Sequence, residues 1–536
     1  MELKNIYEIS RKLNIDDKYV EPYGKYKAKI DLSINEELKD VQDGKLVLVT
    51  AITPTKFGEG KTTISIALQE GLNRIGTRSV LCLREPSLGP VFGLKGGATG
   101  GGKVTIEPHE DINLHFTGDM HALTSSINLI SCVLDNSIYQ GNPLNIDPTK
   151  VVWKRALDMN DRTLRNIIIG RGAKNGVERE DGFIITVASE LMAILCLSTS
   201  LEDFKERVKK ITVAYTYDDK RVTVGDLNIS NAICKLMKEA INPNLVQTQE
   251  GNPCLIHGGP FANIAHGCNS IIATKLGLKL GDVVVTEAGF GSDLGAEKFL
   301  DIKSQEGHLT PNLVVMVATI RALKVHGGQD LDHIDELNLE SLKVGVANLE
   351  QHLENIKKYH LDVVVAVNHF AFDHQEEIDF LVNWCKEHDY PVSFVDGFLK
   401  GGEGCIELAN IVKERLELNK SKYAPLYNKE EGIKTKIERI AKEIYRAGQV
   451  EYSEKAEQDI ARFEKMGFGS SYVCIAKTPQ SFSDDAKLLN VPQNHTLHVK
   501  EVNLSSGANF LVVLTGNVLT LPGLPKVPQA VKMEEE

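Results

Sequence analysis

Short apolar runs rich in valine and isoleucine recur along the chain, and most are followed by glycine-rich turns and longer amphipathic stretches. This alternation is typical of β-α units around a mostly parallel sheet. The segments "TTISIALQEGLNRIG" and "SLEDFKERVKKI" have the apolar spacing of helices between such strands. The predicted strands lie at 45–50, 79–83, 182–188, 282–287, 312–319, 362–368 and 391–396.

The chain is long enough for two to four domains. From about residue 419 to 466 the composition becomes charged and helix-forming, which favours solvated helices. The pattern predicts an α/β protein in which residues 1–360 form a large P-loop NTPase-like domain with a mostly parallel sheet. Two smaller α/β domains are expected at 361–460 and 461–536, the first of them contributing to a ligand site.

Composition and charge narrow the functional classes. Hydrophobic residues make up 42% of the chain and charged residues 25%, the balance of a globular protein. A formal net charge of −12 argues against general binding to nucleic acid or anionic membranes, so an anionic ligand would need a local basic pocket. We expect no membrane span and no signal peptide. The nine cysteines lack metal spacing and indicate reduced thiols in a cytoplasmic protein.

A candidate phosphate loop follows the strand predicted at 45–50. It has the length of a Walker A motif and its Gly-Lys-Thr end, but it begins with threonine where glycine is usual. Backbone N–H groups of such a loop point at phosphate oxygens, and the helix that follows adds its positive dipole end. An ordinary glycine-rich turn is the alternative. The loop consists of Thr55, Lys56, Phe57, Gly58, Glu59, Gly60, Lys61 and Thr62.

A second anion site is expected after the strand at 79–83. Arg84 stands just past its carboxyl end, where ligands of open α/β sheets bind, and its guanidinium can hold a carboxylate or phosphate with two hydrogen bonds. Six glycines follow between Gly93 and Gly102, flanked by Lys95 and Lys103. A glycine-rich segment with two ammonium groups suits an anionic ligand, although a flexible surface loop is the simpler reading.

Several other polar residues leave their roles open. His109, His115 and His121 recur at intervals of six, but the absence of zinc spacing favours polar lining over a metal site. Ligand contact and a purely structural role are equally open for the remaining residues, which are His257, His266, Glu287, Asp293, Arg321, Lys324 and His326.

Blocks of sequence from about residue 50 to 528 resemble the formate–tetrahydrofolate ligase family. The family pattern is matched by the phosphate loop, by "LREPSLGPVFGLKGGA", by "HGGPFANIAHGCNS" and by "EAGFGSDLGAEKF". It is also matched by "VATIRALKVHGG", "KGGEG", "AKTPQSFSDD" and "LTLPGLPKVP". The threonine that opens the phosphate loop is usual in this family.

The resemblance implies an ATP-dependent ligase that joins formate to tetrahydrofolate through formyl phosphate. The loop from Thr55 to Thr62 would bind ATP, with Lys61 as the phosphate clamp and Thr62 beside magnesium. Arg84 matches the family arginine that holds formyl phosphate. The resemblance also implies Mg-ATP, activation by potassium or ammonium, and a homotetramer, with formate, ATP and tetrahydrofolate as the small-molecule partners.

For the folate, the resemblance implies stacking between Phe370 and Phe398, because a flat pterin gains burial between two rings. Phe398 stands where a tryptophan is common, His369 where arginine is frequent, and Lys103 where tyrosine is common. These departures leave the folate affinity open. Phe398 and His369 keep open a diverged acyl-phosphate-forming kinase that does not use folate. Lys61 and Thr62 taken alone would also suit a P-loop NTPase switch.

Overall fold

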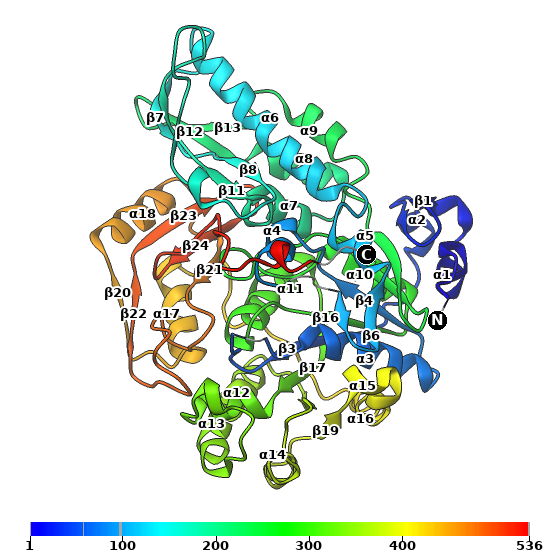
Figure 1. Ribbon diagram of the computed structural model, residues 1–536. Helices are drawn as coiled ribbons and strands as arrows, with labels where there is room; N and C mark the ends of the chain where they lie inside the picture. Colours follow the sequence, from blue (N-terminus) through cyan, green and yellow to red (C-terminus); the bar gives the residue numbers. More distant parts are fainter. Residues whose placement is uncertain (1, 57, 96–98, 534–536) are drawn as a thin grey trace.

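The computed structural model describes residues 2–56, 58–95 and 99–533, and a twelve-stranded sheet forms its centre (Figure 1). The strands run in the order β1 (Val20–Pro22), β2 (Ala28–Ile30), β14 (Asn244–Thr248), β15 (Pro253–Ile256), β4 (Ser79–Leu83), β16 (Val283–Glu287), β3 (Lys45–Ala51), β17 (Pro311–Ala318), β18 (Val363–Asn368) and β19 (Val392–Val395). Two further strands, β6 (Val104–Glu107) and β5 (Gly100–Gly101), extend from β14.

All neighbouring strands from β15 to β19 are parallel, and the β1, β2, β14, β6 and β5 pairings are antiparallel. The predicted α/β class with a mostly parallel sheet is therefore confirmed. Six of the seven predicted strands lie in this sheet within a residue or so of the expected bounds.

The strand predicted at 182–188 is the exception. Only Phe183–Ile185 (β11) is extended, and it pairs with β8 (Arg155–Leu157) outside the central sheet. The chain then forms a short 3-10 turn because Ser189 caps the helix α7 (Glu190–Leu197) through its hydroxyl. The second half of this apolar run therefore leads into a helix and does not extend the strand.

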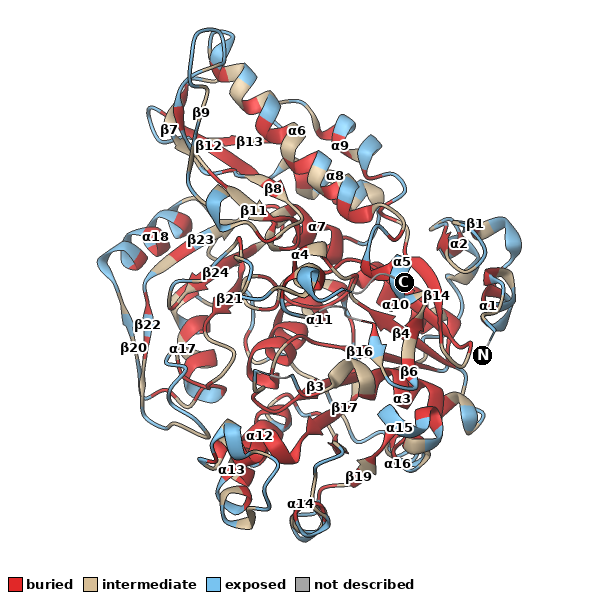
Figure 2. Ribbon diagram, in the orientation of Figure 1, coloured by how far each residue is buried: buried red, intermediate tan, exposed pale blue. Residues whose placement is uncertain are grey.

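The strands of the central sheet are buried on both faces, as Figure 2 shows in red. In β3, Val47 and Val49 pack with α3 (Lys61–Arg74) and α16 (Ile406–Leu418), whereas Leu46 and Leu48 face the opposite layer. That opposite layer includes α10 (Ile271–Leu280), α12 (Ile320–His326) and α13 (Leu339–Lys357). Burial on both faces explains why these strands read as continuous apolar runs.

Two further groups of elements adjoin the sheet (Figure 1). The first contains α6 (Asp119–Tyr139), α8 (Leu201–Lys209), α9 (Ser230–Leu236) and the small sheet of β7 (Ile146–Val151), β12 (Thr212–Thr216) and β13 (Arg221–Thr223). The second contains α17 (Ile433–Glu443), α18 (Glu454–Lys465), β20 (Gln449–Tyr452) with β22 (Thr496–Val499), and β21 (Tyr472–Ala476) with β24 (Phe510–Leu514) and β23 (Glu501–Ser505).

The two expected domain boundaries stay predictions. Residue 360 lies in the turn between α13 and β18, in a stretch that joins the neighbouring strands β17 and β18, and residue 460 lies within α18. The helices of the charged region each bury one apolar face, for example Ile433, Ile437 and Ile440 of α17. Among the helices of the described residues, none combines the length and apolar character needed to cross a bilayer.

Close packing of α12 against α13 generates the first prediction. A Cβ atom at Gly345 would lie only 1.7 Å from the carbonyl oxygen of Leu323, so Gly345→Ala must push the two helices apart. We expect a loss of about 1–3 kcal/mol in the free energy of unfolding, measured by denaturant titration. The neighbouring Val344 is 57% exposed, and Val344→Ala should change stability by less than about 0.5 kcal/mol. Equal stability of the two variants would contradict this packing argument.

Candidate active site

The phosphate loop joins the carboxyl end of β3 to the first turn of α3, which begins at Lys61. Gly58 and Gly60 have φ angles of 76° and 75°, in the left-handed region that glycine adopts without strain. A Cβ atom at Gly60 would also lie 2.3 Å from the side-chain nitrogen of Asn368. The glycine spacing is therefore required by the backbone. Lys56 is exposed, and Phe57 lies outside the described residues.

The side chain of Glu59 fixes the conformation of the loop through hydrogen bonds. Its carboxylate is buried and accepts hydrogen bonds from the Thr55 backbone N–H at 2.7 Å, from the Thr55 hydroxyl at 2.9 Å and from the Thr319 hydroxyl. The side chain of Asn368 donates to the Glu59 carbonyl at 3.1 Å. Glu59 therefore fixes the shape of the loop through its buried side chain. Its predicted contact with ATP stays a prediction.

Arg321, at the start of α12, connects this loop to the expected folate site. Its guanidinium donates to the Gly58 carbonyl, lies 3.9 Å from the Glu59 carboxylate and stacks 3.9 Å from the centroid of the Phe370 ring. Burial lowers the pKa of Arg321, and the Glu59 and Asp373 charges act against that shift. One face of the Phe370 ring is thus covered by an arginine that also fixes the phosphate loop.

Thr62 pairs with a carboxylate of the neighbouring strand. Its hydroxyl lies 3.0 Å and 3.2 Å from the two oxygens of Glu287, the last residue of β16. A hydroxyl and a carboxylate are oxygen ligands of the kind that magnesium prefers, so these residues fit an ion bound with ATP. Lys61 stands one position earlier, at the helix N-terminus, where positive charge and free N–H groups favour an anion.

Arg84 follows β4, the strand next to β16. One guanidinium nitrogen donates to the Pro260 carbonyl at 3.3 Å, while the buried Nε has no hydrogen-bond partner among the described residues. Gly289 leaves room for the guanidinium, since a Cβ there would lie 3.2 Å from Nη1 and 3.3 Å from Nη2. Arg84 therefore lies just past the carboxyl end of β4, and its role in ligand binding stays a prediction.

Phe370 and Phe398 follow β18 and β19, which pair in parallel with Asn368 opposite Val395. Phe398 is 49% exposed, and its ring packs on Gly101 and Gly102 of the glycine-rich segment. The backbone N–H of Lys103 donates to the Phe398 carbonyl at 2.9 Å. Both rings thus project from the same edge as the phosphate loop. Gly96 and Gly97 of that glycine-rich segment lie outside the described residues.

His369, which lies between these features, is engaged with protein groups. Its Nδ1 lies 3.1 Å from an Asp396 carboxylate oxygen, and its ring packs against Phe394 at 5.0 Å between centroids. The nearby Asp373 accepts the Phe370 N–H at 2.8 Å, and burial raises the pKa of that carboxyl to about 6.

Three of the residues with open roles are bound to other protein groups. The buried Lys324 pairs with Glu377 at 3.0 Å and donates to the Glu336 carbonyl. His326 Nε2 lies 3.0 Å from the Thr53 carbonyl, and its Nδ1 accepts the Asn490 N–H at 3.1 Å. Asp293 is buried against Lys477 at 2.6 Å. These contacts favour structural roles for all three.

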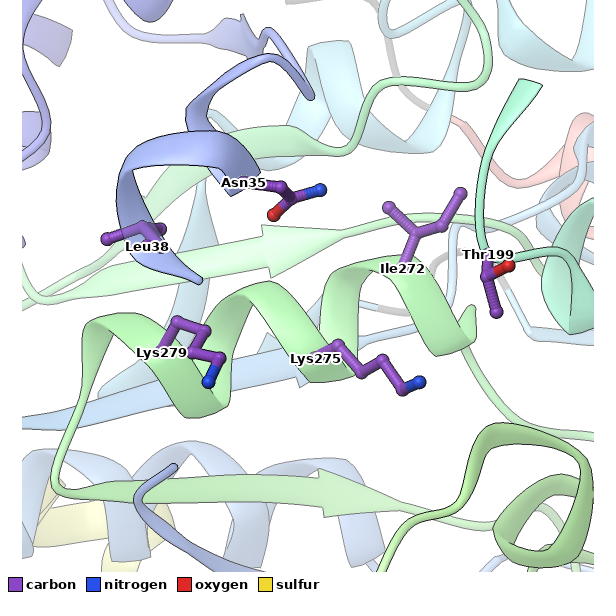
Figure 3. A pocket seen from close by; sticks show the side chains of 6 residues that line it. All are labelled: Asn35, Leu38, Thr199, Ile272, Lys275 and Lys279. Atoms are coloured by element: carbon purple, nitrogen blue, oxygen red, sulfur yellow. The ribbon is translucent and has the colours of Figure 1, made fainter. Parts of the chain in front are cut away.

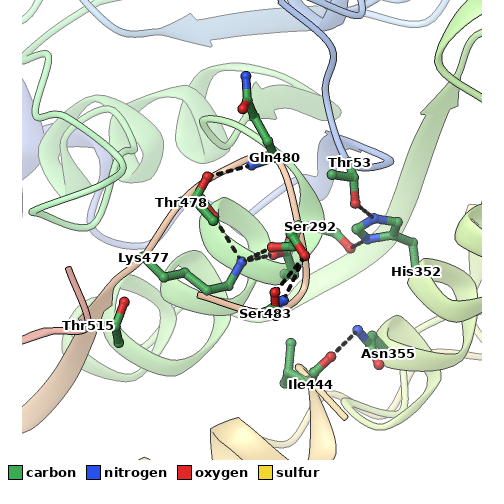
Figure 4. A network of polar contacts seen from close by, with 12 residues as sticks. Thr53, Ser292, His352, Asn355, Ile444, Lys477, Thr478, Gln480, Ser483 and Thr515 are labelled. Carbon is green, nitrogen blue, oxygen red and sulfur yellow. Dashed lines mark hydrogen bonds and ion pairs between the residues drawn. The ribbon is translucent and has the colours of Figure 1, made fainter. Parts of the chain in front are cut away.

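Buried polar contacts surround Thr53, two residues before the phosphate loop, and Lys477 in the C-terminal part of the chain (Figure 4). His352 of α13 bridges the hydroxyls of Thr53 at 2.9 Å and Ser292 at 2.6 Å. Lys477, just past β21, is held by Asp293 and by the carbonyls of Thr478 and Ser481. Burial lowers the pKa of Lys477, and the Asp293 carboxylate opposes that shift. The "AKTPQSFSDD" block is thereby anchored to Asp293 through Lys477.

The histidine series after β6 forms no metal cluster. His115 and His121 contact each other at 2.8 Å between ring nitrogens, and His109 pairs with Glu107 at 3.2 Å. Among the described residues, no group of three or more His, Cys, Asp or Glu side chains is arranged to hold a metal ion.

Two cavities lie away from the sheet edge. One of about 200 Å³ is lined by residues of α10 and its surroundings, including Lys275 and Lys279 (Figure 3). Another of about 600 Å³ lies between β7, α18 and β23. None of the described residues that line them belongs to the phosphate loop, and neither includes Arg84.

The phosphate loop lies at the carboxyl edge of a parallel sheet and leads into a helix, and its threonine is hydrogen-bonded to a carboxylate. This arrangement defines a nucleotide-binding α/β protein. A family model described as formate–tetrahydrofolate ligase matches residues 1–536. The chain therefore belongs to the formate–tetrahydrofolate ligase family. It is a ligase of one-carbon metabolism, EC 6.3.4.3, with ATP and tetrahydrofolate as substrates.

The match confirms the predicted family and enzyme class. It covers the whole chain, so a kinase or NTPase switch that does not use folate is not favoured. Asn368, Thr319 and His352 were not expected from the sequence, because each reaches the loop from a distant segment.

The contacts of Glu59 generate the second prediction. Glu59→Gln removes the negative charge that faces Arg321 and places an amide N–H₂ among groups that donate hydrogen bonds. Hydrogen bonds to charged groups contribute about 1.5–3 kcal/mol, so ATP affinity should fall about 10-fold or more in calorimetric titration. The control Glu37→Gln changes an exposed carboxylate paired with Lys18 and should leave ATP affinity unchanged. An unaltered affinity in Glu59→Gln would refute this role.

Proposed function

We propose that the enzyme activates formate as formyl phosphate before the formyl group reaches tetrahydrofolate. Formate at neutral pH is a carboxylate and a poor electrophile, because direct attack on it would have to expel oxide. One arrangement supports this route. Arg84 follows β4 and the phosphate loop follows β3, and these two strands lie on either side of β16, so both groups are at the same edge of the sheet. An anionic acid held by Arg84 would face the γ-phosphate of ATP in the loop.

In the first step, a formate oxygen attacks the γ-phosphorus and the bond to the β-γ bridging oxygen breaks, releasing ADP. Negative charge is spread over the transferring phosphoryl oxygens, so fixed positive groups lower the barrier. Lys61 and the N-terminus of α3 supply that charge from the nucleotide side, and Arg84 supplies it from the formate side. Magnesium held by Thr62 and Glu287 would neutralise charge on the β- and γ-phosphates.

In the second step, N10 of tetrahydrofolate attacks the formyl carbon. The carbon–oxygen bond to phosphate breaks, inorganic phosphate leaves with the bonding electrons, and N10 loses a proton. Phe370 and Phe398 would hold the pterin ring. The free energy of this stacking would offset the entropy lost when the folate is aligned with formyl phosphate. Arg321 lies over the Phe370 ring, and the Phe372 ring stacks with Phe370 at 5.9 Å between centroids.

The remaining parts of the proposal follow from the family resemblance. They are magnesium bound with ATP, activation by a monovalent cation such as potassium or ammonium, assembly into a homotetramer, and location in the cytoplasm.

The reaction is tested by following ADP release with Mg-ATP and potassium present. We expect full turnover only when formate and tetrahydrofolate are both added, with 10-formyltetrahydrofolate detected by absorbance. Turnover of ATP that ignores formate and folate would overturn the proposed reaction.

The phosphate clamp generates the third prediction. Lys61→Ala should reduce ATP-dependent turnover by about 100-fold or more, because one preorganised charge on the transferring group is lost. Circular dichroism should report an unchanged fold. The control Lys343→Ala removes an exposed ammonium paired with Glu340 and should retain full activity. Normal turnover in Lys61→Ala would exclude the clamp role.

The formate site generates the fourth prediction. Arg84→Ala should lower kcat/KM for formate by about 10- to 100-fold, because a charge-assisted hydrogen bond to the acid is lost. The Kd for ATP should stay within about twofold, since the loop is unaltered. Arg78, near the opposite end of β4, pairs with Asp282 on the surface, so Arg78→Ala is a matched control with expected wild-type kinetics. Unchanged formate kinetics in Arg84→Ala would reject the assignment.

A further inference from the structure

The guanidinium of Arg321 contacts two segments that are far apart in the sequence. It donates to the carbonyl of Gly58, inside the phosphate loop, and its Cζ lies 3.9 Å from the centroid of the Phe370 ring, which follows β18. Arg321 is only 9% exposed, so neighbouring protein groups hold this side chain in place. One side chain therefore touches both the loop expected to bind ATP and the ring expected to stack on the folate.

The first turn of α12, which carries Arg321, is joined to the phosphate loop by side chains. The Thr319 hydroxyl caps this helix by accepting the Ala322 backbone N–H at 3.2 Å, and the same hydroxyl donates to the buried Glu59 carboxylate. The Nε of Arg321 lies 3.9 Å from that carboxylate. The cap and the opposite charge together fix where the guanidinium lies relative to the loop.

The Phe370 ring is held through its backbone as well as at its face. The Phe370 N–H donates to the Asp373 carboxylate at 2.8 Å, and the Asp373 N–H donates to the Phe370 carbonyl at 2.9 Å. These two hydrogen bonds close the turn after β18. The turn fixes where the side chain begins, and the guanidinium lies against the ring itself. The orientation of the ring therefore depends on Arg321.

An arginine suits this position better than a lysine does. Glu59 and Asp373 are the carboxylates whose charges act on Arg321, and Lys324, one turn further along α12, is paired with Glu377 at 3.0 Å. A planar guanidinium can donate hydrogen bonds in its own plane while its face lies on an aromatic ring. A lysine ammonium has no such plane, so it cannot make the two contacts in the same way.

We propose that Arg321 is a positioning residue for two substrates, because it holds the phosphate loop for ATP through the Gly58 carbonyl and orients the Phe370 ring for tetrahydrofolate. This assignment rests on the proposed function, in which Phe370 stacks on the folate. Arg321 acts through these two groups and is not itself a catalytic residue. Its loss therefore weakens the binding of ATP and of tetrahydrofolate together, whereas Lys61 and Arg84 each serve one substrate.

The test compares Arg321→Met with a matched control, Arg415→Met. Arg415 is also largely buried and pairs with a carboxylate, that of Asp362, through two hydrogen bonds of 2.7 Å. Asp362 stands immediately before β18, at the end of the strand opposite to Phe370. Calorimetric titration with Mg-ATP in the absence of formate, and separately with tetrahydrofolate, gives both dissociation constants for each variant.

Arg321→Met should raise the Kd for ATP about 10-fold or more, because a charge-assisted hydrogen bond to the loop is lost. The Kd for tetrahydrofolate should rise about 3- to 30-fold, because the ring loses the group that lies on its face. Arg415→Met should leave both constants within about twofold of the wild type, even though the loss of its ion pair lowers the Tm.

A conservative variant separates the two contacts of Arg321. Arg321→Lys keeps the positive charge beside Glu59 but loses the planar contact with the Phe370 ring. It should recover more of the ATP affinity than of the folate affinity. A purely structural defect would lower both affinities together with the Tm, and this variant also carries the comparison if Arg321→Met is too unstable to titrate.

A double-mutant cycle with Phe370→Leu shows whether Arg321 acts on the folate through the ring. In the Phe370→Leu background, Arg321→Met should change the Kd for tetrahydrofolate by less than about a further twofold, while its effect on the Kd for ATP persists. Equal effects on tetrahydrofolate in the two backgrounds would overturn the assignment. It is also overturned if Arg321→Met matches the wild type in both affinities, or if it loses only stability as Arg415→Met does.

Failure of the proposed function has a different signature. If the wild-type enzyme binds no tetrahydrofolate, or releases no ADP when formate and tetrahydrofolate are added, the proposed reaction falls before any variant is compared. If the wild type binds both substrates and turns over, and Arg321→Met gives no difference, the reaction stands and the assignment of Arg321 alone is lost.

Discussion

The common direction of six neighbouring strands is the constraint on which the rest of the structure depends. Because β4, β16, β3, β17, β18 and β19 are all parallel, their carboxyl ends meet at one edge of the sheet. The residues at or just after these ends are, in this order, Arg84, Glu287, the phosphate loop, Thr319 with Arg321, Phe370 and Phe398. Neighbouring strands lie about 4.8 Å apart, so strand order sets the spacing of these groups. The phosphate loop lies between the strands that carry Arg84 and Glu287 and the strands that carry the two phenylalanines.

The phosphate loop is held by buried charges and hydrogen bonds more than by apolar packing. Glu59, His352 and Lys477 are each nearly or fully inaccessible, yet each has partners that compensate part of the cost of burial. Removing one partner from such a set leaves the other buried without compensation, which costs far more than the pair contributes. Arg321 belongs to the same system, because it joins the Gly58 carbonyl to the Phe370 ring. The geometry of the phosphate loop and the position of the Phe370 ring are therefore linked through the Arg321 side chain.

The sequence predicts most of the central sheet because doubly buried parallel strands are continuous apolar runs, as in 45–50 and 362–368. It fails at 182–188, where a serine cap after a similar run starts a helix. The loop, Arg84 and the family could be inferred from local motifs. The supporting residues could not, since Thr53 and His352 lie about 300 positions apart in the chain and no local pattern encodes their contact. His257 and His266 have similar sequence surroundings, and only the structure shows that His257 is bound to the Ser270 hydroxyl and the Ala240 carbonyl.

The ion pair between Asp293 and Lys477 affects the order in which parts of the chain fold. During synthesis, Asp293 emerges long before Lys477, so its carboxylate at first lacks the ammonium that compensates its charge in the folded chain. Closing such distant contacts carries an entropy cost that is met only late in folding. The ion pair is therefore completed only when the segment that carries Lys477 docks, and a chain without that segment keeps an uncompensated carboxylate at Asp293.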